Sequence, residues 1–206
     1  MIPGAIALAV GADPKTRPAG GRIALLSKDD IHDLAFDPST PSWAAPDDLS
    51  VEAQFAHDQQ GILATFVVKD QTHSPAPVDA KLFAGDSIQF SLASGNKLTQ
   101  IGLTTSDGGA GWVWSSPDSA LVGKKLTTPL KVTRSGNTTI YEVFFPFEML
   151  GFRYEPGLLL RAAFLANEDD GGGRVRVMQW FDGITTGGDL TKFGFILLEE
   201  SRSQLI

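Results

Sequence analysis

The chain has 206 residues, a formal net charge of -7 at neutral pH and no cysteine. This length is sufficient for one domain that buries most of its apolar surface without covalent cross-links. The missing cysteines exclude disulfides and thiolate chemistry, and the acidic balance argues against nucleic acids and anionic membranes as partners.

The first 21 residues are expected to form a linker or first strand ahead of a single domain over residues 22–206. Their apolar stretch covers about nine residues, which is too short to span a bilayer, and no basic segment precedes it as in a signal peptide. The sequence therefore predicts no membrane insertion. We interpret this region as part of a longer chain from which the domain was cut.

Short strands separated by turns are predicted through the first half of the domain. The candidates are residues 22–26, 51–57, 62–68, 87–93 and 98–104. The loop over residues 69–84 is longer than a simple connection requires. Long loops on compact scaffolds are often functional, so this segment is a candidate part of a site.

The pattern of short strands continues in the second half, at residues 112–115, 130–134, 138–145 and 193–199. Residues 121–129 are typical of a loop or an edge strand. Residues 146–150 are expected to form one helical turn, because Pro146 suits its first position and Gly151 follows its end.

The strongest signal lies in residues 158–179. Residues 158–165 are an apolar run typical of a strand buried on both faces, and residues 175–179 alternate as a returning strand does. The intervening NEDDGGG, residues 167–173, has three glycines that permit positive φ and acids that we expect to stay solvated. The prediction is a hairpin with an acidic tip, with Trp180 just beyond its second arm.

Taken together, roughly ten short strands with turns about every 8 to 12 residues and almost no helix predict an all-β fold. We expect an antiparallel β-sandwich of jelly-roll or immunoglobulin-like type with one short helical turn. Neither an internal repeat nor a low-complexity segment is present in the sequence.

Five pieces in a fixed order link residues 48–198 to a known family. They are DLS at 48–50, VVKD at 67–70 with His73 after it, LFAGDSIQF at 82–90, YEVFFPFEMLG at 141–151, and NEDDGGGR at 167–174 followed by QWFDGI and FGFILL. In their order and spacing the chain resembles the family 9 carbohydrate-binding modules and the wider group of DOMON-like sandwich domains.

The resemblance implies a non-catalytic β-sandwich that binds calcium structurally and holds sugar ends between aromatic rings. By motif position, Phe83 falls where the family usually has a tryptophan, and Trp180 falls on a second aromatic position after the glycine-rich loop. Gln89 occupies the place of a polar, often acidic, sugar contact.

A sugar binder needs an aromatic plane and a few fixed polar groups, because sugars combine an apolar face with a rim of hydroxyls. Our candidate ligand-binding residues are Phe83, Gln89, Trp112, Trp114, Asn167, Arg174 and Trp180. A competing interpretation is open for the aromatic ones. Trp112 and Trp114 share one face of a strand and are typical core residues, and Phe83 beside a strand start is also typical of the core.

Calcium prefers six to eight oxygen ligands from carboxylates and loop carbonyls. Our candidate ligands are Asp70, Asp86, Asp169 and Asp170. The alternative is a solvated hairpin tip for the last two, and for Asp86 a carboxylate that accepts from backbone N–H groups at a strand entry.

The leading hypothesis is a non-catalytic carbohydrate-binding module of a bacterial polysaccharide-processing or cell-surface protein. We expect it to be secreted or at the cell surface, with the periplasm as a further location. We also expect it to be monomeric, tethered to other domains, and to bind mono-, oligo- or polysaccharides.

Three other functions stay open. The first is a structural or protein-interaction sandwich that has lost its sugar site, which is favoured by Phe83, Gln89 and the missing arginine contact of the family. The second is a haem domain using Met149 or Met178, although neither has an obvious histidine opposite. An enzyme acting on polysaccharide is the third, but the sequence has no G-x-S-x-G, H-E-x-x-H or P-loop motif.

Overall fold

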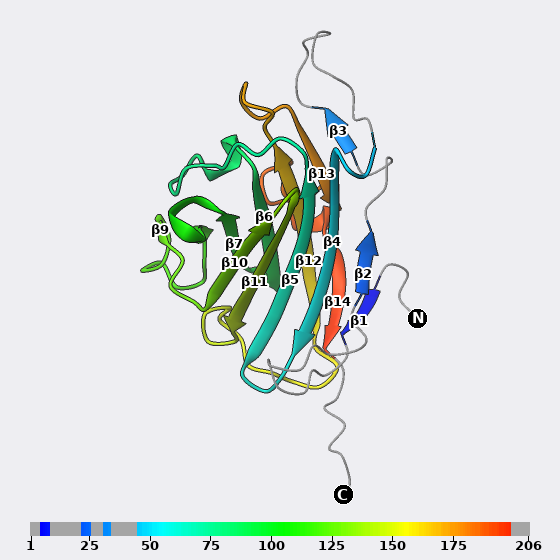
Figure 1. The fold of residues 1–206 in the computed structure, drawn as a ribbon. Coiled ribbons are helices and arrows are strands. Elements are labelled where there is room, and N and C mark those ends of the chain that lie inside the picture. The colour runs from blue at the N-terminus through cyan, green and yellow to red at the C-terminus, as the bar shows by residue number, and fades with distance from the viewer. Residues whose placement is uncertain (1–4, 9–21, 26–30, 34–44, 199–206) are drawn as a thin grey trace, which may run out of the picture.

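The computed structural model describes residues 45–198 in full and the backbone of three shorter segments, residues 5–8, 22–25 and 31–33. Two β-sheets pack face to face, and the described residues contain no α-helix (Figure 1). The fold is the all-β sandwich that the sequence predicts.

The larger sheet has nine strands. Its main path runs in the order β1 (Ala5–Leu8), β14 (Gly194–Leu198), β12 (Leu159–Glu168), β6 (Ser87–Ser94), β7 (Lys97–Thr104), β8 (Ala110–Ser115) and β9 (Lys124–Lys125). Off this path, β13 (Arg176–Trp180) pairs with β12, and β3 (Ile31–Asp33) pairs with β13. All pairs are antiparallel except β1 with β14.

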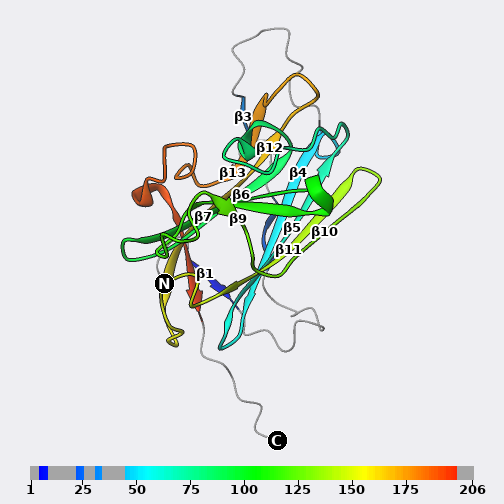
Figure 2. The same ribbon diagram turned by 90° about the vertical axis from the view of Figure 1, so that its left-hand side faces the viewer.

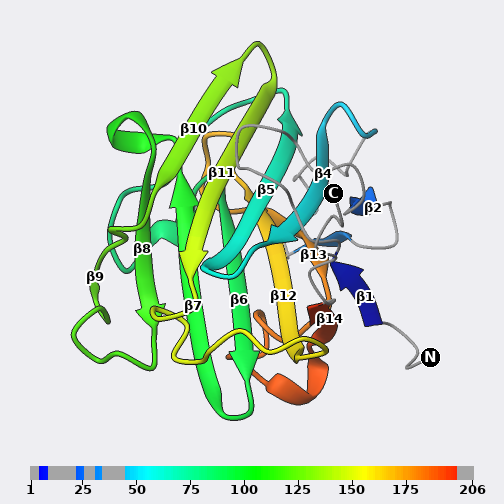
Figure 3. The same cartoon turned by 90° about the horizontal axis from the view of Figure 1, so that it is seen from below.

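The smaller sheet has five antiparallel strands. Their order is β10 (Leu130–Ser135), β11 (Thr138–Pro146), β5 (Gly61–Asp70), β4 (Leu49–His57) and β2 (Arg22–Leu25). Figures 2 and 3 show this sheet from two further directions, with β10, β11, β5 and β4 lying over the strands of the larger sheet.

The strand boundaries follow from alternation in the sequence. In β5, Ile62, Ala64 and Phe66 point inward and are fully buried, whereas the residues between them are partly exposed. A period of two places every second side chain on the same face of a strand, so this alternation defines the core face. The predicted strands of the described region are confirmed to within a few residues at each end.

A cluster of phenylalanine rings joins the two sheets. Phe55 of β4 stacks on Phe90 of β6, with ring centroids 5.1 Å apart, and Phe66 of β5 meets Phe164 of β12 edge to face at 5.5 Å. Each ring is 2 % exposed or less. Aromatic pairs in this geometry stabilise the core beyond the burial of their area.

The larger sheet is also covered on its outer face, the face turned away from the core. There Ala163, Leu165 and Val177 form a second apolar cluster with Ile184 and Phe193 from the segment between β13 and β14. Strand β12 is therefore buried on both faces, as its apolar run predicts.

The helical turn at residues 146–150 is a single hydrogen-bonded turn. Leu150 N donates to the Pro146 carbonyl at 3.2 Å, and Gly151 follows with φ of 72°. Glycine tolerates this left-handed conformation best, which explains why the turn ends there.

Candidate functional site

The predicted polar contacts Gln89 and Asn167 lie on neighbouring strands, on the outer face of the larger sheet. Gln89 alternates with the core residues Ile88 and Phe90 of β6, and so faces away from the core. Its Nε2 donates to Asn167 Oδ1 at 3.2 Å, and Asn167 Nδ2 donates to Ser87 Oγ at 2.9 Å. Both amides are at most 6 % exposed.

This buried network supports the short turn that carries Phe83. Ser87 Oγ lies 2.9 Å from the carbonyl of Leu82, the first residue of the 3₁₀ turn η2 (Leu82–Ala84). Because Ser87 also accepts from Asn167, the turn is fixed to β6 and β12 together. Gln89 and Asn167 thus act as supports beneath the turn, with little of either amide reaching the surface.

Phe83 and Arg174, two predicted ligand residues far apart in the sequence, lie side by side at this turn. The Phe83 side chain is 40 % exposed, and the Arg174 guanidinium carbon lies 5.8 Å from the centre of its ring. The structure therefore does not place Phe83 in the core. An exposed ring with a cation over its face is a surface on which a ligand ring can stack.

Arg174 has no carboxylate partner among the described residues 45–198. Its Nε atom is buried without a hydrogen-bond partner, and burial lowers the pKa of the guanidinium from its usual value. A desolvated donor without an acceptor is costly, so the site favours a ligand that brings hydroxyl or anionic oxygens.

Trp112 and Trp114 also lie on the outer face, on β8, while Val113 between them points into the core. Trp114 Nε1 donates to the Ala80 carbonyl at 3.0 Å. A Cβ added at Gly102 would lie 2.5 Å from Leu82 and 2.6 Å from the Trp114 ring, so both side chains cover this glycine. The core interpretation of the two tryptophans is wrong, because both lie on the outer face of the sheet, where Trp114 packs beside η2.

Trp180 is the last residue of β13 and faces the core side of the larger sheet. Its ring is stacked on Phe164 with centroids 5.6 Å apart, and it is only partly exposed. It does not join Phe83, because its register partner Phe164 belongs to the core. Phe181, which the sequence analysis did not single out, is 39 % exposed and packs against Gly194.

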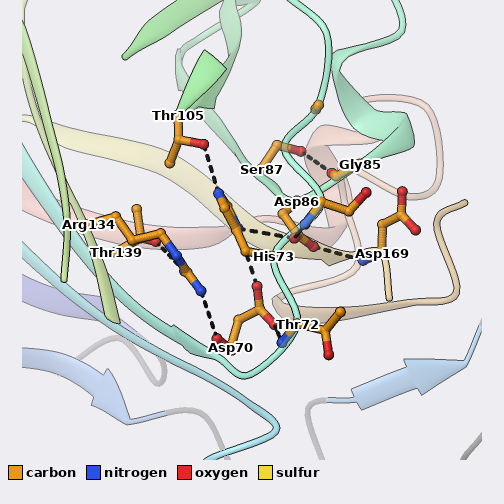
Figure 4. Close-up of polar contacts among 12 residues, drawn as sticks. Asp70, Thr72, His73, Gly85, Asp86, Ser87, Thr105, Arg134, Thr139 and Asp169 are labelled. Carbon is orange, nitrogen blue, oxygen red and sulfur yellow. Dashed lines mark hydrogen bonds and ion pairs between the residues drawn. The ribbon is translucent and has the colours of Figure 1, made fainter. Parts of the chain in front are cut away.

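The long loop over residues 71–86 begins at a buried group of charged side chains (Figure 4). His73 Nδ1 lies 3.1 Å from Asp86 Oδ2 and 3.4 Å from Asp70 Oδ2, and its Nε2 lies 2.8 Å from Thr105 Oγ1. The two carboxylates raise the pKa of His73 to about 9, so the imidazole is a cation at neutral pH. The sequence analysis noted His73 only as part of a motif.

Asp86 connects separate loops through backbone hydrogen bonds. Its Oδ1 accepts from Asp169 N at 2.7 Å, and its Oδ2 accepts from Ser74 N at 2.5 Å. Burial is the main cause that raises the pKa of Asp86 to about 6. Both carboxylate oxygens of Asp86 therefore accept hydrogen bonds from backbone N–H groups, which is the alternative to a metal ligand that the sequence left open.

The hairpin tip after β12 differs from its prediction. Glu168 is fully buried and Asp169 is 8 % exposed, whereas Asp170 is exposed. Asp169 Oδ1 accepts from the backbone N–H groups of Gly171 and Gly173, both at 2.8 Å. The expectation of solvated acids is therefore wrong for Glu168 and Asp169, because Glu168 still belongs to β12 and lies on its core side, and Asp169 accepts hydrogen bonds from the backbone of the tip.

A second acidic group forms where the tip meets the end of β5. Carboxylate oxygens of Asp70, Glu168 and Asp170 all lie within 4.8 Å of one another. Arg176 lies 2.9 Å from Glu168 Oε2, and it also faces Asp48 at 3.4 Å. One guanidinium thus faces more carboxylates than it can neutralise.

Glu168 carries the strongest sign of a missing partner in this group. It has no exposed surface, and its Oε1 has no hydrogen-bond partner among the described residues. Burial and the neighbouring acids raise its pKa to about 8. An oxygen-rich cluster of this kind fits a hard cation such as calcium.

Glu168 was missed among the predicted metal ligands, whereas Asp70 and Asp170 are brought together. The signal was present, because Phe164, Ala166 and Glu168 follow the period of two along β12 and share its core side. Of the other predicted ligands, Asp86 uses both carboxylate oxygens for backbone N–H groups, and Asp169 uses its Oδ1 in the same way.

The methionines considered for haem ligation both lie in the hydrophobic core, Met149 at 8 % and Met178 at 0 % exposed. The helical segments of the described residues are single 3₁₀ turns, and none of them could span a bilayer.

No protein-family model and no curated protein matches the sequence. Solved structures do match the fold. The chain is similar over 98 % of its length to a family 9 carbohydrate-binding module from Caldicellulosiruptor kristjanssonii in complex with cellotriose, with 14 % identity, 97 % of that chain covered and a TM-score of 0.62. The fold is that of a family 9 carbohydrate-binding module.

Two further structures agree with this family 9 fold. The same organism's module in complex with glucose matches with 14 % identity, 98 % coverage of both chains and a TM-score of 0.61. A candidate carbohydrate-binding protein from Bacteroides uniformis matches 73 % of this chain and 79 % of its own, with 12 % identity and a TM-score of 0.51.

Proposed function

We propose that the domain is a non-catalytic carbohydrate-binding module whose site lies on the outer face of the larger sheet, around η2. The observation that carries this proposal is the exposed Phe83 ring with the Arg174 guanidinium over it. The apolar face of a sugar ring stacks on the phenyl ring, and the guanidinium donates hydrogen bonds to its hydroxyls.

The neighbouring residues have supporting roles in this proposal. Gln89 and Asn167 hold η2 in place through Ser87, and so keep the Phe83 ring at a fixed height over the sheet. Trp112 and Trp114 extend the aromatic surface along β8. The fold agrees with this function, since the two matching modules from C. kristjanssonii are complexes with cellotriose and glucose.

A calcium ion is proposed at Asp70, Glu168 and Asp170, where the donor set and the unpartnered Glu168 oxygen suit it. It would neutralise mutually repelling carboxylates and connect the hairpin tip to the end of β5. Its role would be structural, because the same tip carries Arg174, only four residues after Asp170.

In the larger context, we propose that the domain is an accessory module of a bacterial protein that is secreted or displayed at the cell surface, acting as a monomer tethered to other domains. Binding to a polysaccharide would hold the rest of such a protein near its substrate and raise the effective local concentration.

The test is calorimetric titration of the domain with glucose and cellotriose, with tryptophan fluorescence as a second signal because Trp114 lies against η2. Phe83→Ala is expected to weaken binding by about tenfold or more, the value of one lost stacking contact of 1.4 kcal/mol or more. The matched control is Phe144→Ala, on the outer face of the smaller sheet.

An unchanged affinity in Phe83→Ala would contradict the proposed site. If neither glucose nor cellotriose nor other neutral or acidic sugars bind the unaltered domain, the interaction-domain alternative replaces the proposal. One observation favours that alternative: the Gln89 and Asn167 amides already satisfy one another.

A further inference from the structure

A large groove lies at the end of the sandwich opposite the acidic cluster. It forms where the β4–β5 turn, the β6–β7 turn and the segment after β11 meet, and its volume is about 990 Å³. Strand β6 runs from the η2 end of the molecule to this end, so its eight residues separate the groove from Phe83 by about 25 Å. In Figure 1 the segment after β11 forms the lower end of the molecule.

The walls of the groove are fixed to one another. Phe147 N donates to the Gln60 carbonyl at 2.9 Å, which ties the segment after β11 to the β4–β5 turn. Lys97 Nζ donates to the Gly151 carbonyl, which ties the same segment to the β6–β7 turn. A groove that exists before a ligand arrives does not have to be ordered at the cost of affinity.

Aromatic rings form the floor. Phe147 is almost fully buried, and the Tyr154 ring lies nearly parallel to it, with centroids 6.0 Å apart and an interplanar angle of 21°. Phe152 packs against Phe147 at 5.5 Å. Phe152 and Tyr154 are only partly buried, so part of each ring is available to an occupant.

The rim is polar and balanced in charge. Lys97 and Arg153 are opposed by Glu148 and Glu155, and the side chains of Gln59 and Gln60 add two amides. In the described region, the Lys97 bond to Gly151 is the only hydrogen bond that these six side chains make. Charged and neutral hydrogen-bond donors and acceptors are therefore available around an aromatic floor.

These features define the chemistry of the occupant. A ligand with a net charge meets two like charges on the rim, whereas a neutral ligand with many hydroxyls can use the cations, the carboxylates and the amides together. Aromatic floors suit the apolar faces of sugar rings. The volume is at the upper end of the range for small-ligand sites, roughly 300 to 1,000 Å³, which admits more than one sugar ring.

We propose that this groove is a second binding site, for a short neutral oligosaccharide. The inference goes beyond the site around Phe83 and does not rest on it, because no residue is shared between the two. With sites at both ends of the sandwich, one domain can hold two glycan chains, or two points of one chain, and gain avidity.

The experiment combines calorimetry, tryptophan fluorescence and two-dimensional NMR of the ¹⁵N-labelled domain, with neutral trisaccharides of glucose, xylose and mannose as probes. No tryptophan lines the groove, so its occupation is expected to release heat and shift amide signals without changing the fluorescence. The Gln59 and Gln60 side-chain amides report on the groove, and the Trp114 indole reports on the site around Phe83.

Three variants separate the two sites. Phe83→Ala is expected to keep the groove signals, whereas Tyr154→Ala is expected to lower affinity for the groove by tenfold or more. Because Tyr154 packs on Phe147, a second variant, Arg153→Ala, removes an exposed rim group without disturbing the floor, and it is expected to lower the same affinity two- to fivefold.

The inference is overturned if no probe shifts the groove amides at millimolar concentration, or if the shifts persist unchanged in both Tyr154→Ala and Arg153→Ala. If the sugars shift the groove amides but leave the Trp114 indole signal unchanged, the site around Phe83 is contradicted and the groove is not. If they shift the Trp114 indole signal but leave the groove amides unchanged, the groove is contradicted and the site around Phe83 is not.

Discussion

The two ends of the sandwich use charged side chains in opposite ways. At the end with Asp70, Asp86 and Glu168, the charges are buried and their partners are loop backbone groups, His73 and Arg176. At the groove end, Glu148 and Arg153 are exposed and make no ion pair with a described residue. Buried charges have large effects on stability and exposed ones have small effects, so charge substitutions are expected to be costly at the acidic end and tolerated at the groove end.

Replacing Arg176 gives the sharpest contrast between the ends. Arg176→Met removes the cation that faces the buried Glu168, and it is expected to lower the free energy of unfolding by about 3–5 kcal/mol in calcium-free buffer above pH 8, where Glu168 is ionised. Arg153→Met at the groove end is expected to change it by less than about 0.5 kcal/mol. Urea unfolding of both variants measures the difference, and equal losses would contradict the contrast.

Calcium is expected to stabilise only the acidic end. At a concentration one hundred times its dissociation constant, a specific ion adds about 2.7 kcal/mol to the stability. For a domain of this size that corresponds to a rise in melting temperature of roughly 5–10 °C. Differential scanning calorimetry with calcium and with EDTA is expected to show this rise, with none in Glu168→Gln.

Glu148→Gln is the matched control for the calcium experiment, because it removes an exposed acid from the groove end. It is expected to keep the full response to calcium. A rise of the same size in Glu168→Gln would show that the ion binds elsewhere.

The pH dependence of the calcium-free domain tests the same buried charges. The folded-state pKa of Glu168 is raised from 4.5 to about 8, and that of His73 from 6.5 to about 9. Because the folded state holds both protons more tightly, the stability that they contribute is complete below the unfolded pKa values and is lost as pH rises through the folded ones.

Urea unfolding in EDTA is therefore expected to show a fall of several kcal/mol between pH 5 and pH 9. The slope between pH 5 and pH 8 is expected to flatten in Glu168→Gln, and Glu148→Gln is expected to leave it unchanged. Stability that is constant or rises over this range would mean that Glu168 is ionised in the folded domain without a cation.

A small effect on stability is also expected for Arg174→Gln, because this guanidinium makes no ion pair with a described residue. Its expected effect is on binding: a loss of about tenfold in sugar affinity, equal to 1.4 kcal/mol, with the melting temperature changed by no more than 1–2 °C. Calorimetric titration beside a thermal melt separates the two. A large drop in melting temperature would assign Arg174 a structural role.

Local patterns in the sequence were sufficient for the strands and for part of the site. Alternation located β5 and β11, the apolar run located β12, and Pro146 with Gly151 located the helical turn. These predictions succeed because strand periodicity and turn conformation depend on neighbouring residues.

Contacts between segments that are distant in the chain could not be predicted from such local patterns. Arg174 lies over Phe83 although 91 positions separate them, and Trp180 turns toward the core because its register partner is Phe164. The groove depends on three separate connections that meet only after the sheets have packed.

By itself, then, the sequence determined the strands, the sandwich class and the acidic character of the tip, through local periodicity and composition. Which acids are buried, which aromatic rings face outward and where a cavity opens were decided by the tertiary structure, because register and loop packing set the neighbours of each side chain.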